Sequence, residues 1–292
     1  MAEATAPAGA PYVLPPELLI DTGVARQIIG EFIRGHLDQT GFKRMVLALS
    51  GGLDSALVAY LLAESIGPDN LLCVMLPYRT SSPESRSDAE AVIAAIGCES
   101  QLIDITPMVD GYFGDDADVS PLRRGNFAAR QRMAVLYDRS VTFGGLVVGT
   151  GNKTESLIGY TTIFGDNAAA LQPIADLYKT QVRQLAADIG MPGVILRKPP
   201  TADLWAGQTD EQEVGLRYSD IDRLLYWSVD RRRTHVQLLA MGFDAANIER
   251  VERLVAGAEF KRQTAPIAKL GPRTPGVDYL YPRRRPRPAK SD

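Results

Sequence analysis

The sequence predicts an α/β protein in which helices cover both faces of a parallel sheet, a three-layer α/β/α arrangement with extra helices at the C-terminal end. Short apolar runs alternate with segments of helical periodicity over the first half of the chain, and this alternation is typical of a parallel sheet with crossover helices. The runs are mostly apolar throughout, as expected of strands buried on both faces. The 292 residues are 45% hydrophobic and 23% charged, an ordinary composition for a globular protein with a large core.

Strands and helices are expected in turn along the first half of the chain. Apolar residues at helical spacing predict a helix over 16–37. The apolar runs predict strands at 44–49, 71–76, 101–105 and 145–148. The segments between them predict helices at 53–66, 83–96 and 126–143. Glycine and proline mark the ends of two of these helices, because Gly67 and Pro68 stop one, and Pro83 can open and Gly97 can close the next.

The second half begins with a long polar segment. Residues 151–180 are expected to be mostly loop and are rich in side chains that suit polar ligand contacts. Helices are expected at 177–189, 218–229, 234–241 and 244–261. A single domain is expected over 16–271, between a flexible leader at 1–15 and a Pro/Arg-rich tail at 272–292. The tail is interpreted as solvated or as a dimer strap, rather than as an RNA-binding arm.

Several classes of protein are not expected from the composition. The formal net charge of −3 offers no basic field for nucleic acid. No apolar run approaches the ~18–20 residues of a membrane span, and the leader lacks the pattern of a signal peptide. Cys73 and Cys98 form no CxxC pair and are expected to be buried free thiols of a cytoplasmic protein. His36 and His235 have no nucleophile beside them in the sequence and are interpreted as structural.

The strongest local signal is the segment 50–55, Ser-Gly-Gly-Leu-Asp-Ser, which stands between an expected strand and an expected helix. Glycines let backbone N–H groups approach an anion without a Cβ in the way, and the N-terminus of a helix adds unpaired N–H groups and a favourable dipole. The segment lacks the lysine of a Walker A loop. It therefore predicts a phosphate or pyrophosphate site, the alternative being an ordinary strand-to-helix turn with Asp54 in the first helical turn.

This segment resembles the pyrophosphate loop of the N-type ATP pyrophosphatases, and motifs in the second half resemble the NAD synthetases among them. The resemblance covers roughly 27–282 and appears in the family's order, at 126–133 (NFAARQRM), 149–155 (GTGNKTE), 159–162 (GYTT), 165–166 (GD), 173–174 (PI), 177–183 (LYKTQVR), 198–204 (KPPTADL) and 207–211 (GQTDE). It implies a Rossmann-like, adenine nucleotide alpha hydrolase-like fold. It also implies a homodimer.

The resemblance implies an ATP-dependent ligase that amidates deamido-NAD. Attack of the nicotinate carboxylate on the α-phosphate of ATP would make an acyl-adenylate and release pyrophosphate, and ammonia would then displace AMP. Such chemistry needs Mg²⁺, groups that neutralise phosphate and exclusion of water more than it needs a protein nucleophile. No glutamine-hydrolysing part is expected, so ammonia, either free or passed from a separate protein, is the implied nitrogen donor.

Site residues are carried over from the matching positions. Asp54 and Glu155 match Mg²⁺ ligands, and carboxylates suit that hard cation. The implied catalytic residues are Asp54, Lys179 and Thr201. The implied ATP contacts are Ser50, Gly51, Gly52, Leu53, Asp54, Ser55, Arg79, Thr150, Lys179 and Thr201, and Ser85 is a companion of Arg79. Taken singly, these carboxylates could be solvated, Lys179 could lie at a surface helix start, and Arg79 could be an exposed loop arginine.

The implied deamido-NAD contacts are Arg130, Phe260 and Lys261, and Arg130 matches a residue that commonly acts across a dimer interface. Three positions depart from the best-known bacterial pattern: Ile163, Ala170 and Phe260 stand where that pattern has lysine, aspartate and histidine. An apolar side chain cannot replace an ion pair or a hydrogen bond. The chain is therefore either a subgroup that binds deamido-NAD differently or a related ligase for another carboxylate. A third alternative is a non-catalytic ATP-binding module.

Overall fold

The computed structural model describes residues 14–114, 116, 118–201 and 209–278. Most of the expected leader at 1–15 and most of the expected tail at 272–292 lie outside the described residues. Within the described part of the chain, no helix is both long and apolar enough to cross a membrane.

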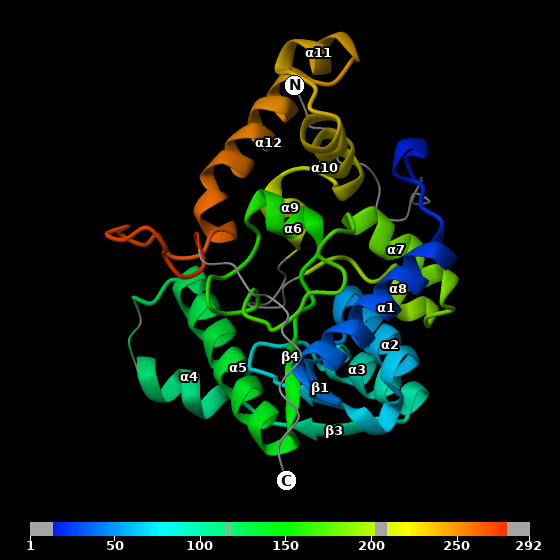
Figure 1. The fold of residues 1–292 in the computed structure, drawn as a ribbon, viewed down its shortest axis with the longest axis vertical. Helices are drawn as coiled ribbons and strands as arrows, with labels where there is room; N and C mark the ends of the chain where they lie inside the picture. Colours follow the sequence, from blue (N-terminus) through cyan, green and yellow to red (C-terminus); the bar gives the residue numbers. More distant parts are fainter. Residues whose placement is uncertain (1–13, 115, 117, 202–208, 279–292) are drawn as a thin grey trace.

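A four-stranded parallel sheet lies in the lower half of the molecule as drawn in Figure 1, and the sequence predicts such a sheet. The strands lie in the order β3-β2-β1-β4, with bounds Arg44–Ala48 (β1), Leu71–Met75 (β2), Glu99–Leu102 (β3) and Gly145–Val148 (β4). The chain runs from β1 outward to β3 and then returns to the other side of β1. The connections therefore change direction between β1 and β4, and open α/β sheets bind ligands at such a point, beyond the carboxyl ends of the strands.

Helices cover both faces of this sheet, which confirms the three-layer prediction. One face packs against α1 (Thr22–Thr40), α2 (Leu53–Ile66), α3 (Pro83–Ile96) and α7 (Lys179–Asp188). The other face packs against α4 (Thr106–Phe113) and α5 (Pro121–Phe143). Successive residues of β1 point to opposite faces, because Met45 belongs to the first core and Val46 to the second, and both are 0% exposed.

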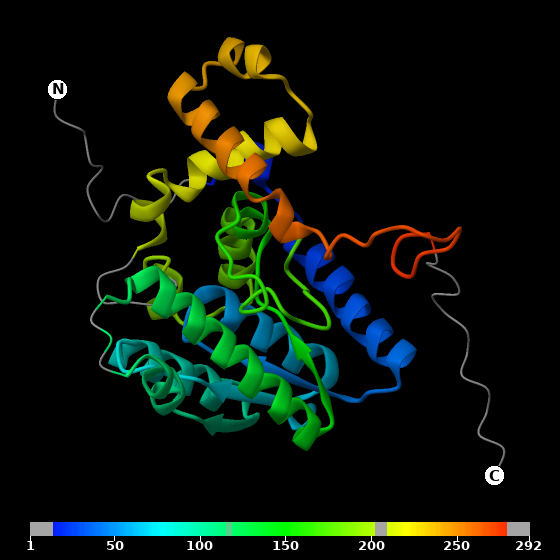
Figure 2. The ribbon, with the colours of Figure 1, turned by 90° about the vertical axis from the view of Figure 1, so that its left-hand side faces the viewer.

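A helical cap lies beyond the carboxyl ends of the strands (Figure 2). It contains α6 (Lys153–Ile158), α9 (Asp210–Val214), α10 (Tyr218–Leu225), α11 (His235–Ala240) and α12 (Ala245–Gly257). A third hydrophobic core joins these helices, with Ile158 of α6, Ile221 of α10 and Val251 of α12 in contact through it. The expected helix at 244–261 ends earlier, at Gly257, and is followed by the 3₁₀ turn Glu259–Arg262.

Most differences from the sequence-based expectation concern helices. The helix expected at 16–37 is a 3₁₀ turn, Pro16–Leu18, followed by α1, because Asp21 accepts a hydrogen bond from the N–H of Val24 and so caps a new helix. Ser120 caps α5 in the same way and starts it at Pro121. The short helices α4, α6, α8 (Gly193–Arg197) and α9 were not expected, since one or two turns carry little periodicity.

The two cysteines are buried free thiols, as expected, but they are also neighbours. Cys73 lies in β2 and Cys98 immediately before β3, and their Sγ atoms are 3.5 Å apart. Parallel pairing of β2 with β3 brings them together, so tertiary structure creates a contact that spacing in the sequence does not suggest.

Candidate active site

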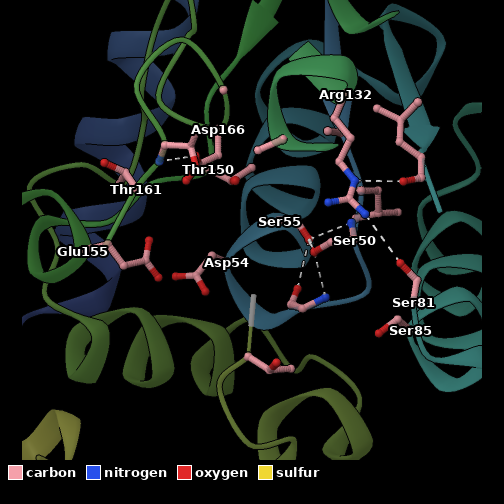
Figure 3. A pocket seen from close by; sticks show the side chains of 18 of the residues that line it. Ser50, Asp54, Ser55, Ser81, Ser85, Arg132, Thr150, Glu155, Thr161 and Asp166 are labelled. Atoms are coloured by element: carbon pink, nitrogen blue, oxygen red, sulfur yellow. Dashed lines mark hydrogen bonds between the residues drawn. The ribbon is translucent and has the colours of Figure 1, made fainter. Parts of the chain in front are cut away.

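A cavity of about 660 Å³ opens beyond the carboxyl ends of β1, β2 and β4 (Figure 3), at the point where the connections change direction. Its volume lies in the range of small-molecule sites. Its lining comes from segments far apart in the sequence: the loop after β1, the starts of α3 and α7, one face of α5, the polar segment 148–168 and the loop at 198–201.

The loop 50–55 lies on the floor of the cavity and leads into α2. The Ser55 hydroxyl contacts that of Ser50 at 3.0 Å and donates to the Gly52 carbonyl at 3.1 Å. Gly51 has a φ of +76°, and a Cβ placed on it would lie 2.0 Å from the backbone oxygen of Ser85 on α3. The glycine therefore allows the N-terminal turns of α2 and α3 to meet, which supports the anion-site interpretation over an ordinary turn.

A buried lysine lies between two carboxylates beside this loop. Lys179 Nζ forms a short ion pair with Asp54 and lies 3.3 Å from Glu155 Oε1, and the lysine side chain is only 5% exposed. The carboxylates of Asp54 and Glu155 point toward the same region of the cavity (Figure 3). Asn152 donates from Nδ2 to Asp54 at 2.9 Å and caps α6, so one side chain positions both acids.

The charge of this centre fits a divalent cation. Burial lowers the pKa of Lys179, but the charges of Asp54, Glu155 and Asp210 outweigh it and hold that pKa above its usual value. Burial and the charge of Asp54 together raise the pKa of Glu155 to about 8, against the opposing influence of Lys179. Oxygen ligands of this kind suit Mg²⁺, which also keeps water or phosphate oxygens around it. Asp54 and Glu155 are thus the residues that could hold a metal.

Two other predicted ATP contacts also reach the cavity. Thr150 follows β4 and Thr201 ends the loop 198–201, and both line it. Lys198 lines it as well, with Nζ 2.7 Å from Asp88 Oδ2 and 3.3 Å from Ser85 Oγ. Lys198 and Asp88 thus form an ion pair at the cavity wall, although no role was expected for Lys198.

Arg79 is not among the residues that line the cavity. Its guanidinium pairs with Asp110 Oδ2 at 3.1 Å and lies over the ring of Tyr78, and its side chain is 56% exposed. Arg132 lines the cavity instead, donating to the carbonyl of Leu76 at 2.9 Å. In this structure Arg79 therefore pairs with Asp110 of α4 rather than lining the cavity, and its contact with ATP stays a prediction. Ser85, its expected companion, does line the cavity.

Comparisons with known proteins agree with this geometry. The family model described as NAD synthase matches residues 25–265. The chain belongs to the NAD synthase family. A relative named NH(3)-dependent NAD(+) synthetase, from Trichlorobacter lovleyi, is 48% identical over 266 residues, which cover 91% of this chain and 97% of the relative. This NAD synthase family member also resembles solved structures of the family.

Two of those structures differ in their names. One is an NH3-dependent NAD synthetase from Campylobacter jejuni in complex with the nitrate ion, with a TM-score of 0.74, 29% identity and coverage of 86% of this chain and 100% of that one. The other is an NMN synthetase from Francisella tularensis, with a TM-score of 0.76, 29% identity and coverage of 86% and 99%. The solved structures that resemble this NAD synthase family member are therefore named for two different products, NAD and NMN.

The residues expected on the deamido-NAD side are only partly brought together. Lys261 lines the cavity and donates from Nζ to the carbonyls of Gly159 and Thr161, both at 2.7 Å. Arg130 and Phe260 are exposed and lie outside the lining. Arg130 donates to the backbone carbonyl of Ile163 at 3.1 Å. That contact uses the backbone, so it does not depend on the side chain by which position 163 departs from the bacterial pattern.

The cavity-lining residues to which sequence reasoning assigned no role include Arg132, Asp166, Lys198 and Asp210. Each stands inside a motif that carried the family resemblance, so the motifs themselves were the available signal. Asp210 is 3% exposed, and its Oδ1 has no hydrogen-bond partner among the described residues. Only the folded chain shows that its charge acts on Lys179.

Proposed function

We propose that this chain catalyses the ATP-dependent amidation of deamido-NAD to NAD, with ammonia as the nitrogen donor and AMP and pyrophosphate as products. The observation that carries the proposal is the pairing of a glycine-rich anion loop at 50–55 with the buried centre of Asp54, Glu155 and Lys179 in one cavity. Membership of the NAD synthase family and the relatives named NH(3)-dependent NAD(+) synthetase support it.

In the proposed reaction, the site residues bind ATP and stabilise the pyrophosphate leaving group. The carboxylate of the substrate attacks the α-phosphorus of ATP, the bond to the β-phosphate breaks, and pyrophosphate leaves. The loop 50–55 binds phosphate oxygens through backbone N–H groups and serine hydroxyls. Lys179 neutralises charge that develops on the leaving group. Thr150 and Thr201 bind ATP. Ammonia then attacks the acyl carbon, AMP leaves, and the nitrogen loses a proton to form the amide.

Asp54 and Glu155 hold Mg²⁺ in this proposal. When bound, Mg²⁺ supplies positive charge to phosphate oxygens and so favours nucleophilic attack at phosphorus. Without ATP and Mg²⁺, Lys179 pairs with the same two carboxylates, which keeps the buried acids paired between turnovers. The cytoplasmic location stays a prediction of the sequence.

In the decisive experiment, the purified protein is incubated with ATP, Mg²⁺, ammonium and one of two carboxylate substrates as the ammonia acceptor. Deamido-NAD is the proposed one, and the deamidated mononucleotide is its rival because one structural relative is named an NMN synthetase. We expect equal amounts of NAD and pyrophosphate, with kcat/KM for deamido-NAD at least tenfold above that for the mononucleotide. A preference for the mononucleotide would reassign the acceptor, and ATP binding with no amide from either would contradict the proposed reaction.

We also propose that the chain forms a homodimer through α5. Ala134, Tyr137 and Val141 are exposed on one face of that helix, and Val141 is 82% exposed. Their spacing makes a stripe at helical periodicity, with Arg130 one turn before it. A second copy that covers this stripe would bring Arg130 to the neighbouring deamido-NAD site, as the family resemblance implies.

Val141→Asp is expected to weaken the dimer at least tenfold, because it buries a charge at the proposed interface. Light scattering after size-exclusion chromatography measures the change, and KM for deamido-NAD should rise while KM for ATP stays within twofold. Val236→Asp on α11 is the matched control, since Val236 is 73% exposed and lies on another helix. A monomeric wild type, or an unchanged dimer in Val141→Asp, contradicts this interface.

A further inference from the structure

Asp222 lies on α10, outside the cavity, and is 0% exposed. Its Oδ1 accepts a hydrogen bond from the Thr154 hydroxyl at 2.6 Å, and its Oδ2 accepts one from the Thr180 backbone N–H at 2.8 Å. The Thr154 hydroxyl in turn accepts from the backbone N–H of Lys179 at 2.9 Å. One carboxylate from the helical cap therefore joins the first turns of α6 and α7.

These contacts supply what the N-terminus of α7 lacks. The first N–H groups of a helix have no partner within the helix, and the N-cap residue Tyr178 makes no side-chain cap hydrogen bond. Thr154 and Asp222 accept from the first two helical N–H groups of α7 in its place. A negative charge at this end of a helix is favoured by the helix dipole.

The residues that Asp222 contacts are the chain neighbours of the charged centre. Thr154 immediately precedes Glu155, and Thr180 immediately follows Lys179. The hydrogen bonds therefore fix the backbone from which both functional side chains extend, 3.3 Å apart at their tips. Misplacing reacting groups by about 1 Å can cost a hundredfold in rate, so this anchoring matters for turnover as well as for folding.

We propose that Asp222 is a positioning residue of the reaction, which holds α6 and α7 in the relative placement that brings Glu155 and Lys179 together. This inference rests on the proposed function for the roles of those two residues. It assigns Asp222 no contact with substrate. The helical cap thus takes part in building the charged centre rather than only covering it.

A carboxylate is required at this position because both of its oxygens accept hydrogen bonds. An asparagine keeps the shape but has one accepting oxygen, and its amide would place a donor against either the Thr180 N–H or the Thr154 hydroxyl. The Thr154 hydroxyl can turn, but the Thr180 N–H cannot change its role. Asp222→Asn is therefore the variant that removes one anchor with the least change in volume.

We expect Asp222→Asn to lower kcat about 10- to 100-fold and to raise the Mg²⁺ concentration for half-maximal rate, as losses of groups that orient metal ligands do. KM for deamido-NAD should stay within twofold, since Lys261 and Arg130 lie elsewhere. Asp220→Asn is the matched control, because Asp220 is on the same helix and its carboxylate pairs with Arg217 at the surface. Circular dichroism and thermal melting report folding in both.

Thr154 provides a second variant that does not depend on how well Asp222→Asn folds. Thr154→Val removes the hydroxyl between Asp222 and Lys179, whereas Thr154→Ser keeps it, so the serine variant should retain at least tenfold more activity than the valine variant. Combined with Asp222→Asn, the valine change should cost less than the product of the two single losses, because both break one network. The proposal would be overturned if the loss of activity in the double variant equalled the product of the two single losses. It would also be overturned if Asp222→Asn folded and kept the wild-type kcat and Mg²⁺ dependence.

Binding of Mg²⁺ and an ATP analogue tests the positioning role of Asp222 independently of amide formation. Calorimetric titration with an ATP analogue that has a methylene group between its α- and β-phosphates needs no acyl acceptor. If the wild type binds the analogue but forms no amide from ATP, ammonium and either acceptor, the proposed function fails, while a tenfold weaker Mg²⁺-dependent affinity for the analogue in Asp222→Asn still supports positioning. Equal affinities in the wild type and a folded Asp222→Asn would count against it.

Discussion

Asp54→Asn is expected to lower the rate of pyrophosphate release about a thousandfold while leaving the protein folded. Asp54 accepts from Asn152 and pairs with Lys179 at the start of α2, and in the proposed reaction it also holds Mg²⁺. Losing a metal's contribution to the transition state costs several kcal/mol, which converts to a factor of this size. Stability should fall little, because Glu155 remains as a partner of Lys179 and the local excess of negative charge decreases.

The measurement follows pyrophosphate and NAD together, with thermal melting in the absence of Mg²⁺. Asp69→Asn serves as the control, since Asp69 is exposed and lies in the turn before β2, at the opposite edge of the sheet. If Asp54→Asn keeps a tenth of wild-type activity, Asp54 is not a Mg²⁺ ligand. If Asp54→Asn unfolds, the main role of Asp54 is structural, as the partner of the buried Lys179.

Gly51→Ala is expected to destabilise the fold by about 2–4 kcal/mol and to reduce activity about a hundredfold. The positive φ costs ~1 kcal/mol for a residue with a side chain, and overpacking against a rigid neighbour costs ~1–3 kcal/mol more. The neighbour is the backbone oxygen of Ser85, 2.0 Å from the added Cβ, and backbone cannot rotate away as a side chain can. The loop or α3 must move, and both contribute to the cavity.

Gly97→Ala is the matched control for this change. Gly97 has a φ of +77° at the end of α3, but nothing lies within 4 Å of a Cβ placed there. Gly97→Ala should lower the free energy of unfolding by only about 1 kcal/mol, the cost of the positive φ, and should keep the wild-type kcat. Chemical denaturation gives the two stabilities, and steady-state assays give the rates. Equal losses in the two variants would show that the close approach of α3 to the loop does not constrain the site.

The sequence was most informative where local rules act alone. The bounds of α2, α3 and β4 agree with the expectation because glycine and proline end those elements within a residue or two. Strand order was not predictable in this way, since it depends on which apolar faces meet. The helix α4 was missed, and with it Asp110, the residue that pairs with Arg79.

By itself, the sequence determined that the protein is an α/β sheet protein and that it belongs to an ATP-using family of ligases, and it predicts an anion-binding loop at 50–55. Only the tertiary structure decided which side chains share a site. Asp54 and Lys179 are separated by 125 positions, and Thr154 and Asp222 by 68. Local propensity and motif spacing act over a few residues, whereas ion pairs and buried hydrogen bonds depend on distance in space, which packing of the helical cap onto the sheet creates.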